Sequence, residues 1–134
     1  MPPNSSKCDI LIIHIGGNDI NSLPPEELAR RVFYRSRRHP ADFYVFCSIE
    51  PRHDGHRNGW HQVSSDFCAQ ASRYNAALRR LCVSAGNTCF HMLDRQLSSY
   101  LAADGVHLNQ DGQLRFALSL KAAAKRALSE WHRS

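Results

Sequence analysis

Two short polar segments, far apart in the chain, carry side chains suited to acyl-transfer chemistry. Asp104 and His107 stand three residues apart, so that in a tight loop the carboxylate can orient the imidazole and stabilise the imidazolium during proton transfer. The segment Gly16-Gly17-Asn18-Asp19 follows an apolar run. The amide of Asn18, at the end of a buried strand, can donate a hydrogen bond to a developing oxyanion.

Each segment also has a purely structural interpretation. Asn18 and Asp19 can cap the chain locally in a tight turn, and Asp104 and His107 can be ordinary polar residues of a loop. Asn109, at the expected start of a helix, would cap that helix and hold the preceding loop in place.

Three short apolar runs predict the strands that would position these segments. They cover residues 9–15, 43–49 and 88–93. The first two runs are continuous rather than alternating, which is typical of parallel strands covered on both faces.

Helical patterns follow the three runs. Pro24 and Pro25 open the first helix after Ser22 as its cap, and the helix continues to about His39. The second helix begins near Ser64 or Ser65 and ends at Gly86 and Asn87, and the third begins after Asn109. The apolar stripe of the second helix contains Phe67, Ala71, Tyr74, Leu78 and Leu81. The apolar stripe of the third helix contains Leu114, Ala117, Leu118, Ala124, Leu128 and Trp131.

The alternation of strands and helices predicts one α/β domain over residues 1–134, with a small parallel sheet between helices. Right-handed crossovers bring the C-terminal ends of parallel strands to one edge, where such sheets bind ligands. The polar segment 50–62, rich in turn formers, is expected to be an irregular loop over that edge.

Composition and charge narrow the classes of partner. The net charge of +5 includes a cluster of arginines at positions 30, 31, 35, 37 and 38. Such a cluster suits a nucleic-acid contact, but the solvated face of a basic helix is the favoured interpretation. No signal-peptide pattern and no apolar stretch of membrane-spanning length is present, which predicts an intracellular protein with no membrane span.

The cysteines and histidines predict no metal or cofactor. Five cysteines without a CxxC pair argue against a disulfide framework and against a cysteine zinc site. His53, His56 and His61 could bind zinc or copper, but their spacing matches no compact signature, so a solvated or substrate-side loop is favoured. His14 and His91 lie inside predicted strands and are expected to be satisfied core histidines.

Together the two polar segments resemble blocks of the SGNH (GDSL-type) hydrolases. Gly-Gly-Asn-Asp after an apolar strand is similar to the family's GxND block, and Asp-Gly-Val-His before a C-terminal helix is similar to its DxxH block. The resemblance implies a three-layer, flavodoxin-like sandwich and an esterase or acyl hydrolase. It also implies His107 as general base, Asp104 as its partner, Asn18 as oxyanion donor, and an oxyanion loop of Gly16, Gly17 and Asn18.

One block of the family is missing from the sequence. The nucleophilic serine of SGNH hydrolases lies in a Gly-Asp-Ser block upstream of GxND, and these 134 residues contain no such block. Ser5 and Ser6 would lie at the wrong end of the sheet. We therefore expect an N-terminally truncated hydrolase domain, weakly active or inactive, acting on a small ester or acyl substrate. The alternatives are a non-catalytic binding module on the same fold and an arginine-rich fragment that associates with nucleic acid. An exposed strand edge predicts self-association.

Overall fold

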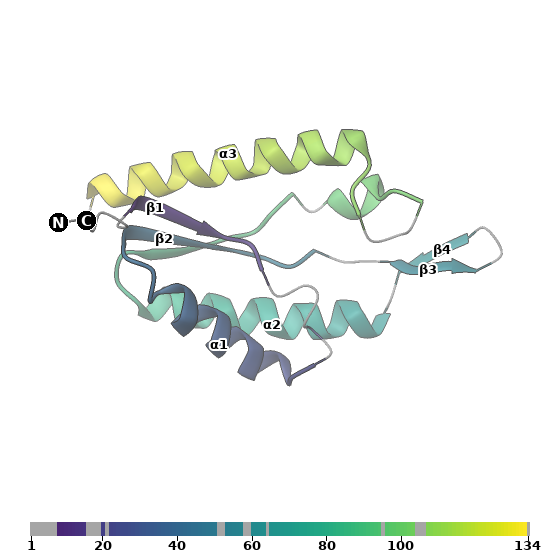
Figure 1. Ribbon diagram of the computed structural model, residues 1–134, viewed down its shortest axis with the longest axis horizontal. Coiled ribbons are helices and arrows are strands. Elements are labelled where there is room, and N and C mark those ends of the chain that lie inside the picture. The colour runs from purple at the N-terminus through teal and green to yellow at the C-terminus, as the bar shows by residue number, and fades with distance from the viewer. Residues whose placement is uncertain are drawn as a thin grey trace.

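The protein has an α/β fold in three layers. The computed structural model describes residues 8–15, 20, 22–50, 53–57, 60–63, 65–94, 96–103 and 107–133. Figure 1 shows a small sheet with helix α3 (Gln110–Arg133) on one side and helices α1 (Pro25–Ser36) and α2 (Ser65–Ser84) on the other. The predicted α/β class with a small parallel sheet is confirmed.

The sheet contains strands β1 (Cys8–Ile13), β2 (Ala41–Cys47) and β5 (Thr88–His91) in the order β1-β2-β5, and both pairings are parallel. These three strands correspond to the three predicted apolar runs, although each ends two residues earlier than expected. Residues 43–47 of the central strand are buried without interruption, because helices cover both faces of β2.

Separate hydrophobic cores lie on the two faces of the sheet. On the side of α1 and α2, the ring of Phe46 stacks on that of Phe33 at 5.2 Å between centroids. Tyr74 is buried in the same core, and its hydroxyl donates a hydrogen bond to the carbonyl of Ile15 at 3.2 Å. Its predicted place in the core is confirmed. On the opposite side, Val45 packs in a second cluster that also contains two alanines of α3.

The structure identifies the residue that begins α1 and the contacts and conformations that follow α1 and α2. Pro24 is the N-cap of α1 and makes no side-chain cap, so the predicted cap at Ser22 is wrong. After α1, the guanidinium of Arg37 lies over the ring of Tyr44 and donates to Thr88. Beyond α2, Asn87 adopts a φ of 47°, the left-handed conformation with which helices commonly terminate.

The expected irregular loop contains an antiparallel hairpin. Strands β3 (His53–Arg57) and β4 (Trp60–Val63) pair through His56 with His61 and Arg57 with Trp60. Figure 1 shows the hairpin beyond the C-terminal ends of β1 and β2. The prediction missed it because neighbouring segments can pair through their backbones without the apolar pattern that identifies a buried strand.

The predicted apolar stripe of α3 is wrong for its largest residues. Leu114, Leu118 and Leu128 are 63%, 57% and 44% exposed, whereas Ala123 and Ala127 are fully buried against the sheet. The helix carries apolar residues on more than one side, and alanines allow its axis to approach the strands closely. His14 is likewise exposed rather than buried, because β1 ends at Ile13. Trp131, predicted to be a core residue, is only half-buried.

Replacing Phe46 by alanine should destabilise the protein by about 3–5 kcal/mol, because a completely buried ring on the central strand would leave a cavity. Equilibrium unfolding in urea measures the change. Val83→Ala is the control, since Val83 is 78% exposed on α2, and its effect should stay within about 0.5 kcal/mol. Equal losses for both variants would contradict the assignment of Phe46 to the core.

Candidate functional site

Most of the predicted catalytic residues lie outside the described part of the chain. Asn18, with Gly16 and Gly17, and Asp104 are among the residues whose placement is not described. His107 is described, and it is exposed immediately before α3. The geometry of the site therefore comes from His107 and from the residues that flank the two segments.

These flanking residues meet at one edge of the sheet. The imidazole of His14, just after β1, packs against the ring of Phe116 in α3 with 5.1 Å between centroids. Ile12, near the end of β1, and Leu108, next to His107, pack against the same buried cluster. That cluster contains Cys47, Leu93 and Leu97. The residues just before the Gly-Gly-Asn-Asp segment and those at the end of the Asp-x-x-His segment therefore lie on the same side of the molecule.

The loop that carries His107 is closed by backbone hydrogen bonds. The N–H of Ala102 donates to the carbonyl of His107 at 2.6 Å, and the N–H of Asn109 donates to the carbonyl of Tyr100 at 2.7 Å. Leu101 and Leu108 form an antiparallel bridge between these bonds. The backbone of His107 is thus held between the 3-10 helix η2 (Leu97–Tyr100) and the start of α3.

The first turn of α3 adds a cap and a close contact to this arrangement. The side-chain oxygen of Asn109 accepts a hydrogen bond from the N–H of Gly112 at 2.8 Å, which confirms the predicted cap. Gly112 lies directly against η2. A Cβ at this position would stand 2.6 Å from the carbonyl oxygen of Tyr100. The start of α3 therefore requires glycine for its approach to η2.

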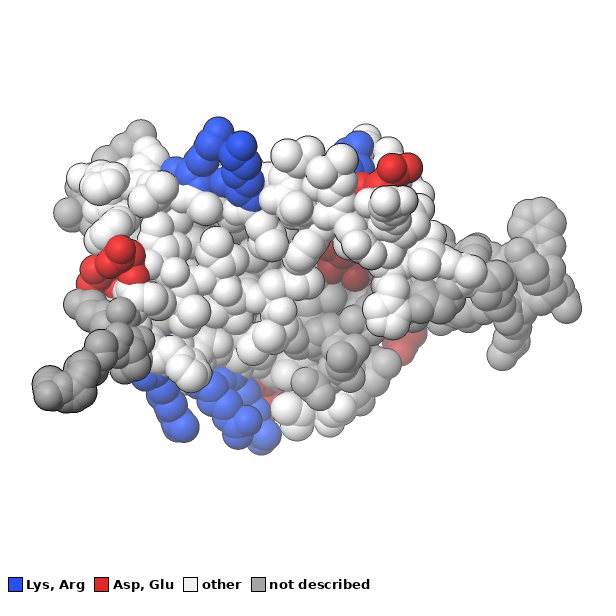
Figure 2. All heavy atoms as spheres, turned by 45° about the horizontal axis from the view of Figure 1, so that its top comes forward, with Lys and Arg blue, Asp and Glu red and all other residues white. Residues whose placement is uncertain are grey.

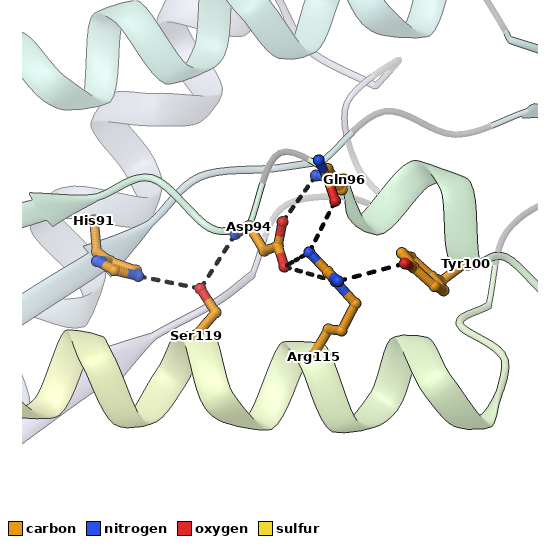
Figure 3. Close-up of polar contacts among 6 residues, drawn as sticks. All are labelled: His91, Asp94, Gln96, Tyr100, Arg115 and Ser119. Carbon is orange, nitrogen blue, oxygen red and sulfur yellow. Dashed lines mark hydrogen bonds and ion pairs between the residues drawn. The ribbon is translucent and has the colours of Figure 1, made fainter.

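Arg115 joins η2 to α3 through a network that the sequence analysis missed (Figure 3). Its guanidinium lies 2.8 Å from the carboxylate of Asp94 and 3.0 Å from the side-chain oxygen of Gln96. It also lies over the ring of Tyr100, 4.8 Å from the centroid. The partners stand far apart in the chain, so no local pattern identifies them. This network holds both ends of the segment that contains His107.

Ser119 and His91 form a serine–histidine contact beside this network. Ser119 Oγ lies 3.3 Å from His91 Nε2 and accepts a hydrogen bond from the N–H of Asp94 at 3.2 Å (Figure 3). Burial lowers the pKa of His91, which keeps the imidazole neutral at neutral pH. Because Ser119 lies in the middle of α3 and already bridges helix and strand, we assign the pair a structural role, which agrees with His91 as a satisfied histidine.

Buried thiols offer no replacement for the missing nucleophile. Burial raises the pKa of Cys47 and Cys82 to about 12 and that of Cys89 to about 11. These thiols stay protonated at neutral pH, and the thiolate is the reactive form of cysteine. Ser5 and Ser6 lie outside the described residues.

Among the residues with described side chains, no group of three or more His, Cys, Asp or Glu is placed to hold a metal ion. His53, His56 and His61 lie on β3 and β4, but their side chains are outside what the structure describes. No helix in the described ranges is long and apolar enough to cross a membrane.

The arginine cluster of α1 is divided among contacts within the protein. Arg30 and Arg31 both pair with Glu27, and Arg37 donates to the carbonyl of Gly86 and to Thr88. These contacts agree with the solvated face of a basic helix and leave less free charge for a nucleic acid.

A cavity of about 560 Å³ lies between α2 and the ends of β2 and β5. Ile49, Phe90 and Met92 supply apolar lining, and Arg79 and Arg80 are exposed at the cavity. The cavity lies on the α2 side of the sheet, opposite α3, so it is separate from the His107 loop.

Gly112→Ala should destabilise the protein by about 1–3 kcal/mol, because the added methyl group would meet the backbone of Tyr100 and force α3 away from η2. Thermal or urea unfolding measures the loss. Gly86→Ala is the matched control, since a Cβ at Gly86 meets nothing within 4 Å. A neutral Gly112→Ala would show that the close contact is not required.

Comparisons with known proteins give no family assignment. Neither the scan against protein-family models nor the search of curated proteins finds a match for this chain. The interpretation of its function therefore depends on the two motif segments and on the geometry of the residues around them.

Proposed function

We propose that this chain is an ester (acyl) hydrolase domain of the SGNH type, in which the Asp104–His107 pair and Asn18 form the catalytic site. The observation that supports this proposal is that residues flanking the two motifs lie at the same edge of the sheet, beside α3. His14 and Ile12 before one motif, and Leu108 after the other, contact α3 or a cluster that α3 covers. A three-layer α/β architecture with a parallel sheet is compatible with the flavodoxin-like sandwich of that family.

In the proposed reaction, His107 acts as the general base. Its imidazole accepts a proton from the attacking nucleophile and later delivers it to the oxygen of the leaving alcohol. Asp104 orients the imidazole and stabilises its charged form, while the Asn18 amide donates to the oxyanion of the tetrahedral intermediate. The closed loop between η2 and α3 supports this role, because a general base must be held in a fixed position.

The nucleophile determines how active the domain is. No Gly-Asp-Ser segment occurs in the 134 residues, so water takes the place of serine in the proposed reaction. Triad enzymes that lose a triad member retain roughly 10³–10⁴-fold acceleration over the uncatalysed reaction, which arises from the oxyanion hole and substrate binding. We expect at most this level, and therefore slow turnover of activated esters.

His107→Ala should reduce the hydrolysis of p-nitrophenyl acetate by roughly 10²-fold or to the buffer rate, because the general base is removed. Release of p-nitrophenolate measures the rate. His132→Ala is the control for non-specific histidine reactivity, since His132 is exposed near the end of α3. Turnover that is unaffected by His107→Ala would contradict the proposed role.

A second candidate function is non-catalytic binding of an amphipathic carboxylate, and the cavity beside α2 favours it. The cavity combines apolar residues with two arginines, Arg79 and Arg80, and one carboxylate, Glu50. The Glu50 carboxylate accepts a hydrogen bond from the Ser48 hydroxyl at 2.6 Å. Its volume of about 560 Å³ suits a small ligand with an apolar tail. Guanidinium groups bind carboxylates with two parallel hydrogen bonds.

Binding of octanoate, measured by calorimetry, tests this candidate. Arg79→Gln/Arg80→Gln should weaken binding at least about tenfold, since charge-assisted hydrogen bonds contribute roughly 1.5–3 kcal/mol each. Arg35→Gln/Arg38→Gln removes the same charge from exposed positions of α1 and the turn after it, and should leave binding unchanged. Saturable binding that is equal in both variants would place the ligand elsewhere.

A further inference from the structure

β1 is an edge strand of the sheet. It pairs with β2 on one side, and within the described residues no strand pairs with its other side. The N–H of Cys8 donates towards β2, to the carbonyl of Pro40 at 3.1 Å. Because alternate residues of a strand direct their N–H and C=O groups to opposite sides, those of Asp9, Leu11 and Ile13 face outward. They form a template for another strand.

The opposite edge of the sheet, formed by β5, is partly covered by a charged side chain. At β5, the guanidinium of Arg126 donates to the carbonyl of Phe90 at 2.9 Å and occupies an edge acceptor. A long charged side chain of this kind is a common protection against strand addition. No described side chain makes a comparable hydrogen bond to Leu11 or Ile13 of β1.

The outer edge of β1 is also flanked by apolar surface. Ile10, Leu11 and Ile12 are only half-buried, although their partners on β2 are buried. On α3, the partly buried Trp131 packs against the same buried cluster as Ile10 and Ile12, and Leu128 is 44% exposed. Figure 2 shows uncharged atoms over the middle of one face, with basic side chains above and below them.

Figure 2 shows basic side chains on two sides of this surface and acidic side chains towards its ends. On α1, Glu26 marks the side that faces α2, because it pairs with Arg73 of that helix. Arg35 lies nine residues further along α1, on the opposite side of the helix, and therefore faces away from α2 and towards the β1 edge. On α3, Lys121 lies opposite the side that carries Arg126, the residue bonded to β5. Arg35 and Lys121 form no ion pair with another described residue. Asp9 is the acidic residue of β1 itself, at its beginning.

We propose that the outer edge of β1 binds an extended segment of a partner protein, with alternating apolar residues and acidic flanks, as an added strand of the sheet. Backbone hydrogen bonds to Asp9, Leu11 and Ile13 supply the pairing, and the acidic flanks meet Arg35 and Lys121. This inference does not depend on the proposed hydrolase activity, because it involves no residue of that site.

A second copy of the chain suits this edge less well. Antiparallel pairing of two β1 strands about a twofold axis perpendicular to the sheet places α1 beside the α1 of the partner. Arg35 of one copy would then face Arg35 of the other across the interface. Juxtaposed like charges disfavour such a pairing, whereas acidic residues at these positions complement it.

The test uses the full chain and a fluorescein-labelled peptide of sequence Glu-Glu-Val-Thr-Val-Thr-Val-Glu-Glu. Anisotropy should show saturable binding, at least roughly tenfold tighter than for the same peptide with Lys in place of Glu. Hydrogen exchange followed by NMR should show slower exchange at the amides of Leu11 and Ile13. A peptide with Pro as its central Val should bind more weakly, because it lacks a ladder donor.

Charge-reversed variants complete the experiment. Arg35→Glu/Lys121→Glu should reverse the preference between the acidic and basic peptides. The matched pair Arg30→Glu/Arg73→Glu, exposed on α1 and α2 on the side away from Arg35, should retain it. Absence of binding, binding without charge preference, or protection at residues other than those of β1 would overturn the proposal. A stable dimer in light scattering, with Leu11 and Ile13 protected in the absence of peptide, would also overturn it in favour of a second copy.

Discussion

Burial of β2 on both faces is the constraint on which the rest of this structure depends. Residues Phe43 to Cys47 have almost no exposed surface, so a helical layer has to cover each side of the sheet. The side chains of Tyr44 and Phe46 pack in the core shared with α1 and α2 on one face. Those of Phe43 and Val45 pack in the core shared with α3 on the other face. Because β1 and β5 pair with β2 in parallel, their C-terminal ends share one edge.

That edge acquires its geometry from the start of α3. The helix can approach the strands closely because Ala123 and Ala127 face them, and Gly112 permits an equally close contact with η2. Arg115 and Asn109 then fix the segment before the helix through hydrogen bonds to side chains and backbone. A loop held in this way suits a residue that must transfer protons from one position, as we propose for His107.

The same architecture explains why the molecule carries unusual apolar surface. A helix that is apolar on several sides can bury only one of them against a sheet of this width. On α3 the small side chains face the strands, so large leucines such as Leu114 and Leu118 face outward. At β1, the lack of a described outer neighbour leaves its apolar residues half-exposed. Exposed apolar patches of this kind commonly mark contacts with partners.

Local patterns alone were sufficient to predict the three strands of the parallel sheet, the three α-helices and the cap at Asn109, because continuous apolar runs and short capping motifs depend on neighbouring residues. The placement of flanking residues at one edge also followed from the expected parallel pairing, since strand direction determines which ends meet. What only the tertiary structure decided was the buried side of α3, the β3–β4 hairpin and the network around Arg115. The buried side of α3 and the Arg115 network depend on which surface or distant side chain is available after packing. The hairpin pairs through its backbone and lacks the apolar pattern of a buried strand. The amino-acid sequence of α3 has apolar residues on two sides of the helix. Which side is buried depends on the space between the helix and the sheet, where the small side chains of Ala123 and Ala127 fit.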